Sequence, residues 1–337
     1  MLQSSLVFLI SAAVIVVAGT KLSYYGDRLA KQTGFGGLWI GVVLMAAATS
    51  LPEVFTTVSA SLLDLPDLAA GDLFGAVMTN MLTLGLIDQI YRSQRVWERA
   101  TFGHTLVACL AMGLTALAGF FILLELNVVF LAVGLDTAIV LLLYILGMRM
   151  IYRQEEAERE RRAHGGERDN DVPDTDPAVD PKRELRRSSI GFSFATLGII
   201  VAAPALASSA GRIAEETGIS TTFIGTTLVA ITTSLPELVT AFAAVRLGAV
   251  DLAVGNLFGS NAFNMAALFF ADAAYQKGPL LAAVSSTHAL SAVWGVLLMN
   301  LALMGIIYRA GKRNPLLEPN SRLMILGYLL GMWLLFR

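Results

Sequence analysis

Thr49-Ser50-Leu51-Pro52-Glu53 lies within a long apolar segment, and the same five residues return 184 positions later as Thr233-Ser234-Leu235-Pro236-Glu237. A carboxylate inside a membrane segment is costly and by default indicates a functional site. A proline that interrupts corresponding helices in two halves of a chain is typical of a transporter's binding site. The repeated motif therefore predicts a membrane carrier whose two halves share one site.

The composition is that of a polytopic membrane protein. Of the 337 residues, 55% are hydrophobic and 15% are charged, whereas soluble domains contain about 25% charged residues. The single cysteine, Cys109, excludes an intramolecular disulfide and a thiolate metal cluster. We expect the lipid bilayer and transported cations as partners, with no cofactor, no nucleic acid and no obligatory protein partner.

Segments of about 20 apolar residues, the length of a spanning helix, occur ten times in the chain. The expected helices cover residues 3–24, 36–63, 67–90, 100–124, 127–151, 190–211, 220–246, 250–275, 281–308 and 318–336. The second and seventh contain the proline motifs and should be broken or kinked there. The first has no basic residue before it, which favours a spanning helix over a cleaved signal peptide.

The two halves align without a gap well beyond the motif. Leu73-Phe74-Gly75, for example, matches Leu257-Phe258-Gly259 at the same offset. Five helices per half is an odd number, so the second half must cross the membrane in the opposite direction. We therefore expect an all-α integral membrane protein with ten transmembrane helices in two inverted five-helix repeats. The first repeat covers residues 1–152 with its motif in 46–91, a polar linker covers 153–189, and the second repeat covers 190–337 with its motif in 230–275.

The basic residues predict the orientation, because lysine and arginine accumulate on the cytoplasmic side. With the linker in the cytoplasm, the ten-helix plan places all but three of the 24 lysines and arginines there, the exceptions being Arg212, Lys277 and Arg337. We expect a multi-pass protein of the cell membrane, plasma or inner, with both termini outside.

The motif supplies hard oxygen ligands. A proline leaves the carbonyl four residues earlier without its helical partner, which frees the carbonyls of Ala48 and Thr232. Glu53 and Glu237 lie within about one turn of them. Carboxylates with carbonyls suit Ca²⁺ or Na⁺ better than a soft transition metal. On the following helix of each half, Asn80 and Asn264 add amide oxygens, and Ser260 and Asn261 join them in the second half only.

The stretches ATSLPE…GDLFGAVMTN and TTSLPE…GNLFGSNAFN resemble the α-repeats of the calcium/cation antiporter superfamily, in its sodium/calcium exchanger branch. The resemblance covers residues 30–91 and 214–275. It implies alternating access, in which the first and sixth helices slide across a core of eight helices. It also implies that Ca²⁺ and Na⁺ compete for overlapping sites.

The resemblance further implies which residues hold the ions. A divalent ion would lie between the carboxylates of Glu53 and Glu237, with the carbonyls of Thr49 and Thr233. Sodium ions would also use a wider set, namely Ala46, Ser50, Asn80, Ala230, Ser234, Ser260 and Asn264.

Several positions depart from the family pattern, among them Ala48 and Thr232, which stand where the family has the glycine before Thr-Ser. Ala76 stands where the family has serine and Val77 where it has asparagine, so the first half lacks two polar groups. Asp72 replaces an asparagine and is either a third acid near the site or a partner for arginines at the cytoplasmic edge. These departures leave the Na⁺ stoichiometry open, and with it the dependence on Na⁺ itself.

Two transport hypotheses follow, and two other classes of protein fit less well. The first is a Ca²⁺ carrier exchanging against Na⁺, and the second is a divalent-cation exchanger coupled to H⁺ or another cation. A cation channel could use the same ligands, but inverted repeats favour a carrier. An enzyme is not expected, because no histidine lies near the repeated motif.

Overall fold

The described part of the chain consists almost entirely of helices, with one short pair of strands. This computed structural model describes residues 2–33, 36–91, 96–130, 133–164, 181–217, 229–308 and 320–335. The helices are α1 (Leu2–Thr33), α2 (Gly36–Trp39), the π-helix η1 (Ile40–Met45), α3 (Ala46–Leu62), α4 (Pro66–Ile90), α5 (Val96–Arg99), α6 (Phe102–Leu124), α7 (Leu135–His164), α8 (Pro181–Thr217), α10 (Val229–Thr233), α11 (Leu235–Arg246), α12 (Val250–Ala274), α13 (Leu280–Ala283), α14 (Thr287–Ile307) and α15 (Asn320–Leu335). Strands β1 (Val129–Phe130) and β2 (Val133–Gly134) pair antiparallel.

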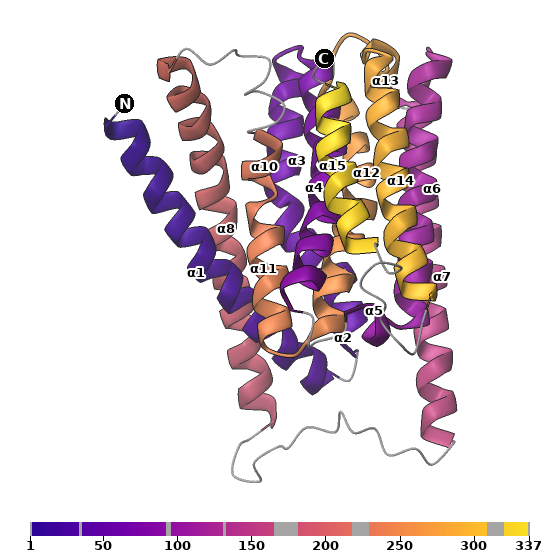
Figure 1. The fold of residues 1–337 in the computed structure, drawn as a ribbon. Coiled ribbons are helices and arrows are strands. Elements are labelled where there is room, and N and C mark those ends of the chain that lie inside the picture. The colour runs from indigo at the N-terminus through magenta and orange to yellow at the C-terminus, as the bar shows by residue number, and fades with distance from the viewer. Residues whose placement is uncertain are drawn as a thin grey trace.

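The helices follow one another in the order of the expected spans. Seven helices in the described part, with α2, η1 and α3 counted as one, are long and apolar enough to cross a membrane. Figure 1 shows that α1 begins on the side where α15 ends, while α7 ends and α8 begins on the opposite side. The two halves therefore cross in opposite directions, as an inverted repeat requires.

Several helix boundaries differ from expectation, some of them because hydropathy marks only the apolar part of a helix. α1 continues to Thr33, α7 extends to His164, and α8 already begins at Pro181. In the extension of α1, Lys31 pairs with Asp27 one turn earlier, at 2.8 Å. The start of α7 is later than residue 127, because the chain first forms the two strands. Residues 165–180 of the expected linker lie outside the described residues.

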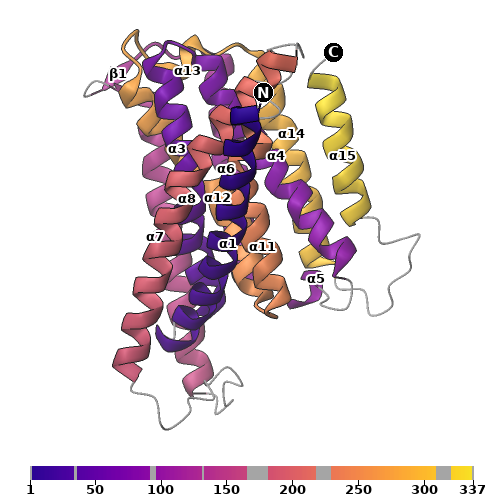
Figure 2. The same ribbon diagram turned by 90° about the vertical axis from the view of Figure 1, so that its left-hand side faces the viewer.

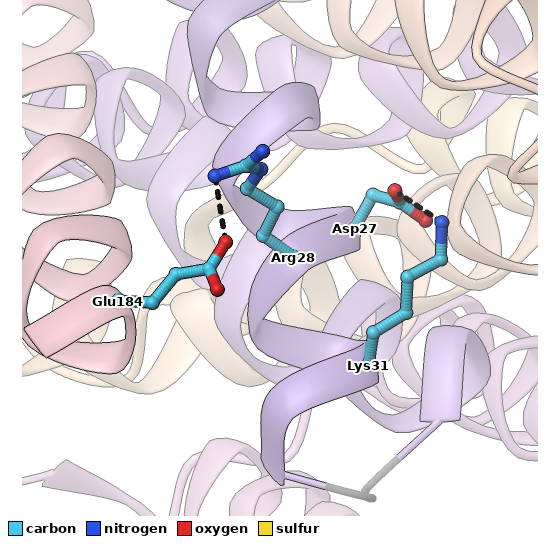
Figure 3. A network of polar contacts seen from close by, with 4 residues as sticks. All are labelled: Asp27, Arg28, Lys31 and Glu184. Carbon is cyan, nitrogen blue, oxygen red and sulfur yellow. Dashed lines mark hydrogen bonds and ion pairs between the residues drawn. The ribbon is translucent and has the colours of Figure 1, made fainter. Parts of the chain in front are cut away.

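Helices α1 and α8 pack side by side at one edge of the bundle (Figures 1 and 2). Near the end where α8 begins, Arg28 of α1 forms an ion pair with Glu184 of α8, at 2.8 Å (Figure 3). Apolar side chains of α1 and α8, such as Leu9, Val17 and Phe194, are more than half exposed in the isolated chain, which suits contact with lipid. The ion pair ties the two helices to each other.

Helix α12 is the centre of the fold. It contacts η1, the segment that leads into the first motif, at positions where one of the two helices has a glycine. A Cβ on Gly259 would lie 2.7 Å from both Cα and O of Val42, and one on Gly41 would lie 2.6 Å from the carbonyl oxygen of Leu252. Real Cβ atoms do not approach backbone atoms so closely. Such small-residue contacts allow membrane helices to approach closely, and this one places η1 and α3 directly on α12.

We predict that Gly259→Ala lowers the melting temperature of the purified protein, since the added methyl group must push α12 away from Val42 backbone atoms. Overpacking of this kind costs about 1–3 kcal/mol. Gly113→Ala is the matched control, because a Cβ on Gly113 meets no atom within 4 Å. Equal melting temperatures for the two variants, measured in detergent, would contradict the close approach of η1 and α12.

Candidate cation-binding site

The two motif glutamates are buried and are held by serines from the opposite halves of the chain. Glu53 and Glu237 are both 0% exposed. Ser50 Oγ donates to Glu237 Oε1 at 2.9 Å, and Ser234 Oγ donates to Glu53 Oε1 at 3.3 Å. The two bonds are equivalent under the repeat, because Ser234 and Glu237 lie 184 positions after Ser50 and Glu53. The structure therefore brings the two copies of the motif together.

The helices that hold the motif are interrupted differently in the two halves. In the second half, α10 ends at Thr233, Ser234 precedes α11, and Pro236 lies in the first turn of α11, so the expected break is present. In the first half, α3 runs without interruption through Pro52. The irregular segment lies earlier, in the π-helix Ile40–Met45. A π-bulge inserts one residue into a helix and occurs frequently at functional sites.

The motif threonines form a second equivalent pair of contacts. Thr49 Oγ1 lies 3.3 Å from Asn256 Oδ1, and Thr233 Oγ1 donates to Asp72 Oδ1 at 3.1 Å. Asn256 lies 184 positions after Asp72. Asp72 thus faces Thr233 in the site rather than an arginine at the cytoplasmic edge. Sequence reasoning missed Asn256, although its offset from Asp72 was a signal that could have found it.

The asparagines of the following helices are buried, but they are not equally paired. Asn80 Nδ2 donates to Asn261 Oδ1 at 2.9 Å. The equivalent contact would join Asn264 to position 77, where valine offers no polar group. Both side-chain polar atoms of Asn264 are accordingly buried without a partner among the described residues. Valine at position 77, in place of the family's asparagine, thus leaves the amide of Asn264 unpaired.

Ser260 of the second half, which has no serine counterpart in the first half, contacts residues of both motifs. Ser260 Oγ donates to Glu237 Oε1 at 3.4 Å and lies 3.4 Å from Thr49 Oγ1. Ala76, at the corresponding position, is buried and supplies no hydroxyl. Glu237 therefore accepts from two serines, whereas Glu53 accepts from Ser234 alone in the described residues.

Several oxygens at this place have no hydrogen-bond donor. Glu53 Oε2, Glu237 Oε2 and Asp72 Oδ2 are all buried and without a partner in the described part. A buried, unsatisfied charged group is expensive, and a hard cation satisfies it directly. Among the described residues, no group of three His, Cys, Asp or Glu could hold one metal ion.

The two alanines expected to contribute backbone carbonyls are described to different extents. Ala46 is fully buried at the start of α3, where the π-helix ends. Ala230 lies in α10, but its side chain and surroundings fall outside the described residues. A ligand role for these two alanines stays a prediction.

Comparison with known proteins places the chain in a family. The family described as "Sodium/calcium exchanger protein" matches residues 3–152 and 187–337. The chain belongs to this family. Its members are transporters and not enzymes, which confirms that expectation, and the ten-helix fold of two inverted repeats is confirmed with it.

Relatives of the exchanger include several membrane proteins. The chain is 30% identical to the inner membrane protein YrbG of Escherichia coli (strain K12) over 79% of its length and 78% of that protein's. It is 22% identical to the putative antiporter CaxA of Alkalimonas amylolytica over 100% of its own length and 99% of that protein's. A 52-residue stretch, 15% of each chain, is 56% identical to the sodium/calcium exchanger MaX1 of Methanosarcina acetivorans.

The exchanger also has a solved structural relative. The sodium-calcium exchanger NCX_Mj, soaked with 10 mM Na⁺ and zero Ca²⁺, superposes with a TM-score of 0.72 over 98% of each chain, at 20% identity. The same protein soaked with 100 mM Na⁺ and 10 mM Sr²⁺ gives a TM-score of 0.72 at 19% identity, over 98% of this chain and 97% of that one. These likenesses establish the shared fold.

We predict that Asn264→Leu does not lower the melting temperature of the ion-free exchanger, because it removes two buried polar atoms that have no partner. Leaving such a group unsatisfied costs about 1–3 kcal/mol. The matched control is Asn261→Leu, which takes the acceptor away from Asn80 Nδ2. This variant leaves a buried donor unsatisfied and should destabilise the protein by about 1–3 kcal/mol. If Asn264 is an ion ligand, the leucine variant also loses part of the stabilisation that added cations give. A clear drop for Asn264→Leu without ions would show that this amide is already paired.

Proposed function

We propose that this exchanger moves Ca²⁺, or a related divalent cation, across the membrane in exchange for Na⁺ by alternating access. The observation that most supports this is the pair of buried glutamates, one from each half, each with one oxygen bonded to the other half's serine and one oxygen free. Two opposed carboxylates with free oxygens suit one divalent ion. The related exchanger NCX_Mj has been soaked with Na⁺, Ca²⁺ and Sr²⁺.

In this proposal the ion binds the two carboxylate oxygens that have no hydrogen-bond donor, Glu53 Oε2 and Glu237 Oε2. Ca²⁺ takes about six to eight oxygen ligands and tolerates flexible geometry, so the carbonyls of Thr49 and Thr233 add to the carboxylates. Sodium ions would use Ser50, Ser234, Ser260, Asn80, Asn264 and the carbonyls of Ala46 and Ala230. The serines that bind the glutamates keep both carboxylates in place when the cargo is absent. No cofactor is needed for such exchange.

The moving part in this proposal is the α1–α8 pair. Both helices lie at the edge of the bundle, where one long face of each is free to slide in lipid. The Arg28–Glu184 ion pair joins them, so they would move together. The glutamates lie on α3 and α11 and are bonded across the two halves, so the site itself would stay fixed while α1 and α8 open it to either side.

We predict that Glu53→Gln and Glu237→Gln each reduce divalent transport by at least about a hundredfold. Removing one partner from a buried set of charges costs about 3–5 kcal/mol, and each 1.4 kcal/mol is tenfold. Uptake of labelled Ca²⁺ into Na⁺-loaded proteoliposomes measures this, with K⁺-loaded vesicles as the ion control. Glu156→Gln, an exposed acid in the extension of α7, is the matched control. Normal uptake by both motif variants would refute the proposed site.

The same uptake assay distinguishes Na⁺ from H⁺ as the coupling ion. The first half lacks the hydroxyl at Ala76, so its sodium ligands are fewer than those of the second half. If Na⁺-loaded vesicles take up no more Ca²⁺ than K⁺-loaded ones, Na⁺ coupling is wrong. Uptake driven by a pH gradient without Na⁺ would then identify an H⁺-coupled exchanger that uses the same glutamates.

We also propose that both termini lie outside the cell and that the segment between α7 and α8 is cytoplasmic. The excess of lysine and arginine on that side supports this orientation. In a Cys109→Ser background, we predict that a membrane-impermeant maleimide labels Gln3→Cys on intact cells. Glu156→Cys should react only after the membrane is permeabilised. The reverse pattern would invert the orientation.

A further inference from the structure

Asp72 is a buried acid in the site that the proposed exchange does not yet use. It lies in the second turn of α4 and is 1% exposed. Its Oδ1 accepts the Thr233 hydroxyl at 3.1 Å, while its Oδ2 is buried without a donor. Asp72 also interacts electrostatically with both Glu53 and Glu237. A third acid therefore adjoins the glutamate pair.

The equivalent residue of the second half shows what this position does when it is neutral. Asn256 Oδ1 lies 3.3 Å from Thr49 Oγ1, and Asn256 Nδ2 donates to Thr240 Oγ1 at 3.1 Å. Both ends of the amide are thus satisfied by protein. A carboxylate at the same place cannot donate, and at Asp72 its second oxygen stays free. A purely structural role would be filled better by asparagine.

Helices α4 and α12 each present a row of three positions, spaced one turn apart, in this region. The row reads Asn256, Ser260 and Asn264 on α12, and Asp72, Ala76 and Asn80 on α4. All six are buried. The first half has therefore lost a neutral oxygen at Ala76 and gained a charged one exactly one turn earlier.

We propose that Asp72 is a direct ligand of a monovalent cation of the Na⁺ type, held beside the glutamate pair by the Asp72 carboxylate and the Thr233 hydroxyl. This inference rests on the proposed cation exchange. Position 76 is an alanine, whereas its counterpart in the second half is Ser260. The ion at Asp72 replaces the sodium ion that a serine at position 76 would help to bind. A single carboxylate with a neutral hydroxyl matches one positive charge. Among the described residues no group of three acids is placed to hold one metal ion, so the proposal gives Asp72 an ion of its own beside the one between the glutamates.

The test compares how Asp72→Asn changes the binding of Na⁺ and of Ca²⁺. Removing a charge that acts only through its field weakens a divalent ion more than a monovalent one, because the Coulomb energy scales with the charge. Removing a direct Na⁺ ligand does the opposite. Binding is followed by the rise in melting temperature of the purified full chain with either ion alone, at constant ionic strength kept with choline chloride.

We expect Asp72→Asn to weaken Na⁺ binding at least about tenfold, the effect of losing about 1.4 kcal/mol, and to weaken Ca²⁺ binding by less. The double variant Asp72→Asn with Ala76→Ser gives α4 the same row as α12, and it should recover Na⁺ binding through the new hydroxyl. Without ions, Asp72→Asn should melt no lower than the wild type, since asparagine fills the equivalent position 256. This control separates misfolding from loss of a ligand.

Two results would overturn the inference. A larger loss for Ca²⁺ than for Na⁺ would mean that Asp72 acts through its field alone, and unchanged binding of both ions would leave it only a partner of Thr233. The proposed function fails in a different way, namely if the wild type binds no divalent ion or transports none. Na⁺ binding that depends on Asp72 would still be measurable in that case, so the two proposals can fail separately.

Discussion

The structure depends on the burial of Glu53 and Glu237 at one place in a membrane protein. Two ionised carboxylates in a medium of low dielectric constant repel each other and lack water. The fold meets part of this cost by giving each carboxylate a serine from the opposite half. For these bonds to form, the two halves must face each other about a common axis. The close glycine contact between η1 and α12 is a further tight junction between the two halves.

The equivalence of the halves extends beyond the cation site. Thr137 Oγ1 donates to Asp272 Oδ2 at 2.6 Å, and Ser321 Oγ donates to Asp88 Oδ2 at 2.5 Å. The first bond joins the far end of α12 to α7, and the second joins the far end of α4 to α15. Ser321 lies 184 positions after Thr137, and Asp272 lies 184 positions after Asp88. Since one set of polar contacts serves both halves, a change in only one half breaks the symmetry visibly, as the unpaired Asn264 shows.

The repeat in the sequence was sufficient to predict the helix count, the inversion and the meeting of the two motifs, because these follow from the offset and the odd number of spans. It could not predict which neutral residues pair across the halves, since the offset marks Asn256 as the counterpart of Asp72 but does not say which side chain either of them faces. The π-helix at Ile40–Met45 was missed as well. Proline has a known local effect, whereas the residue insertion in η1 depends on its contact with α12, which only the three-dimensional structure contains.

The asymmetry at Asp72 has a consequence for the number of ions exchanged. With three buried carboxylates, full neutralisation takes three positive charges, and a single divalent ion leaves one negative charge at Asp72. Moving buried charge without a counter-ion is costly, so a carrier with this site changes state most easily when its charges are matched. If Asp72 holds a monovalent ion, the Ca²⁺-loaded carrier keeps that ion too, whereas the Na⁺-loaded carrier needs three. The acid at position 72 would then set the charge balance of exchange, while the two glutamates choose the cargo.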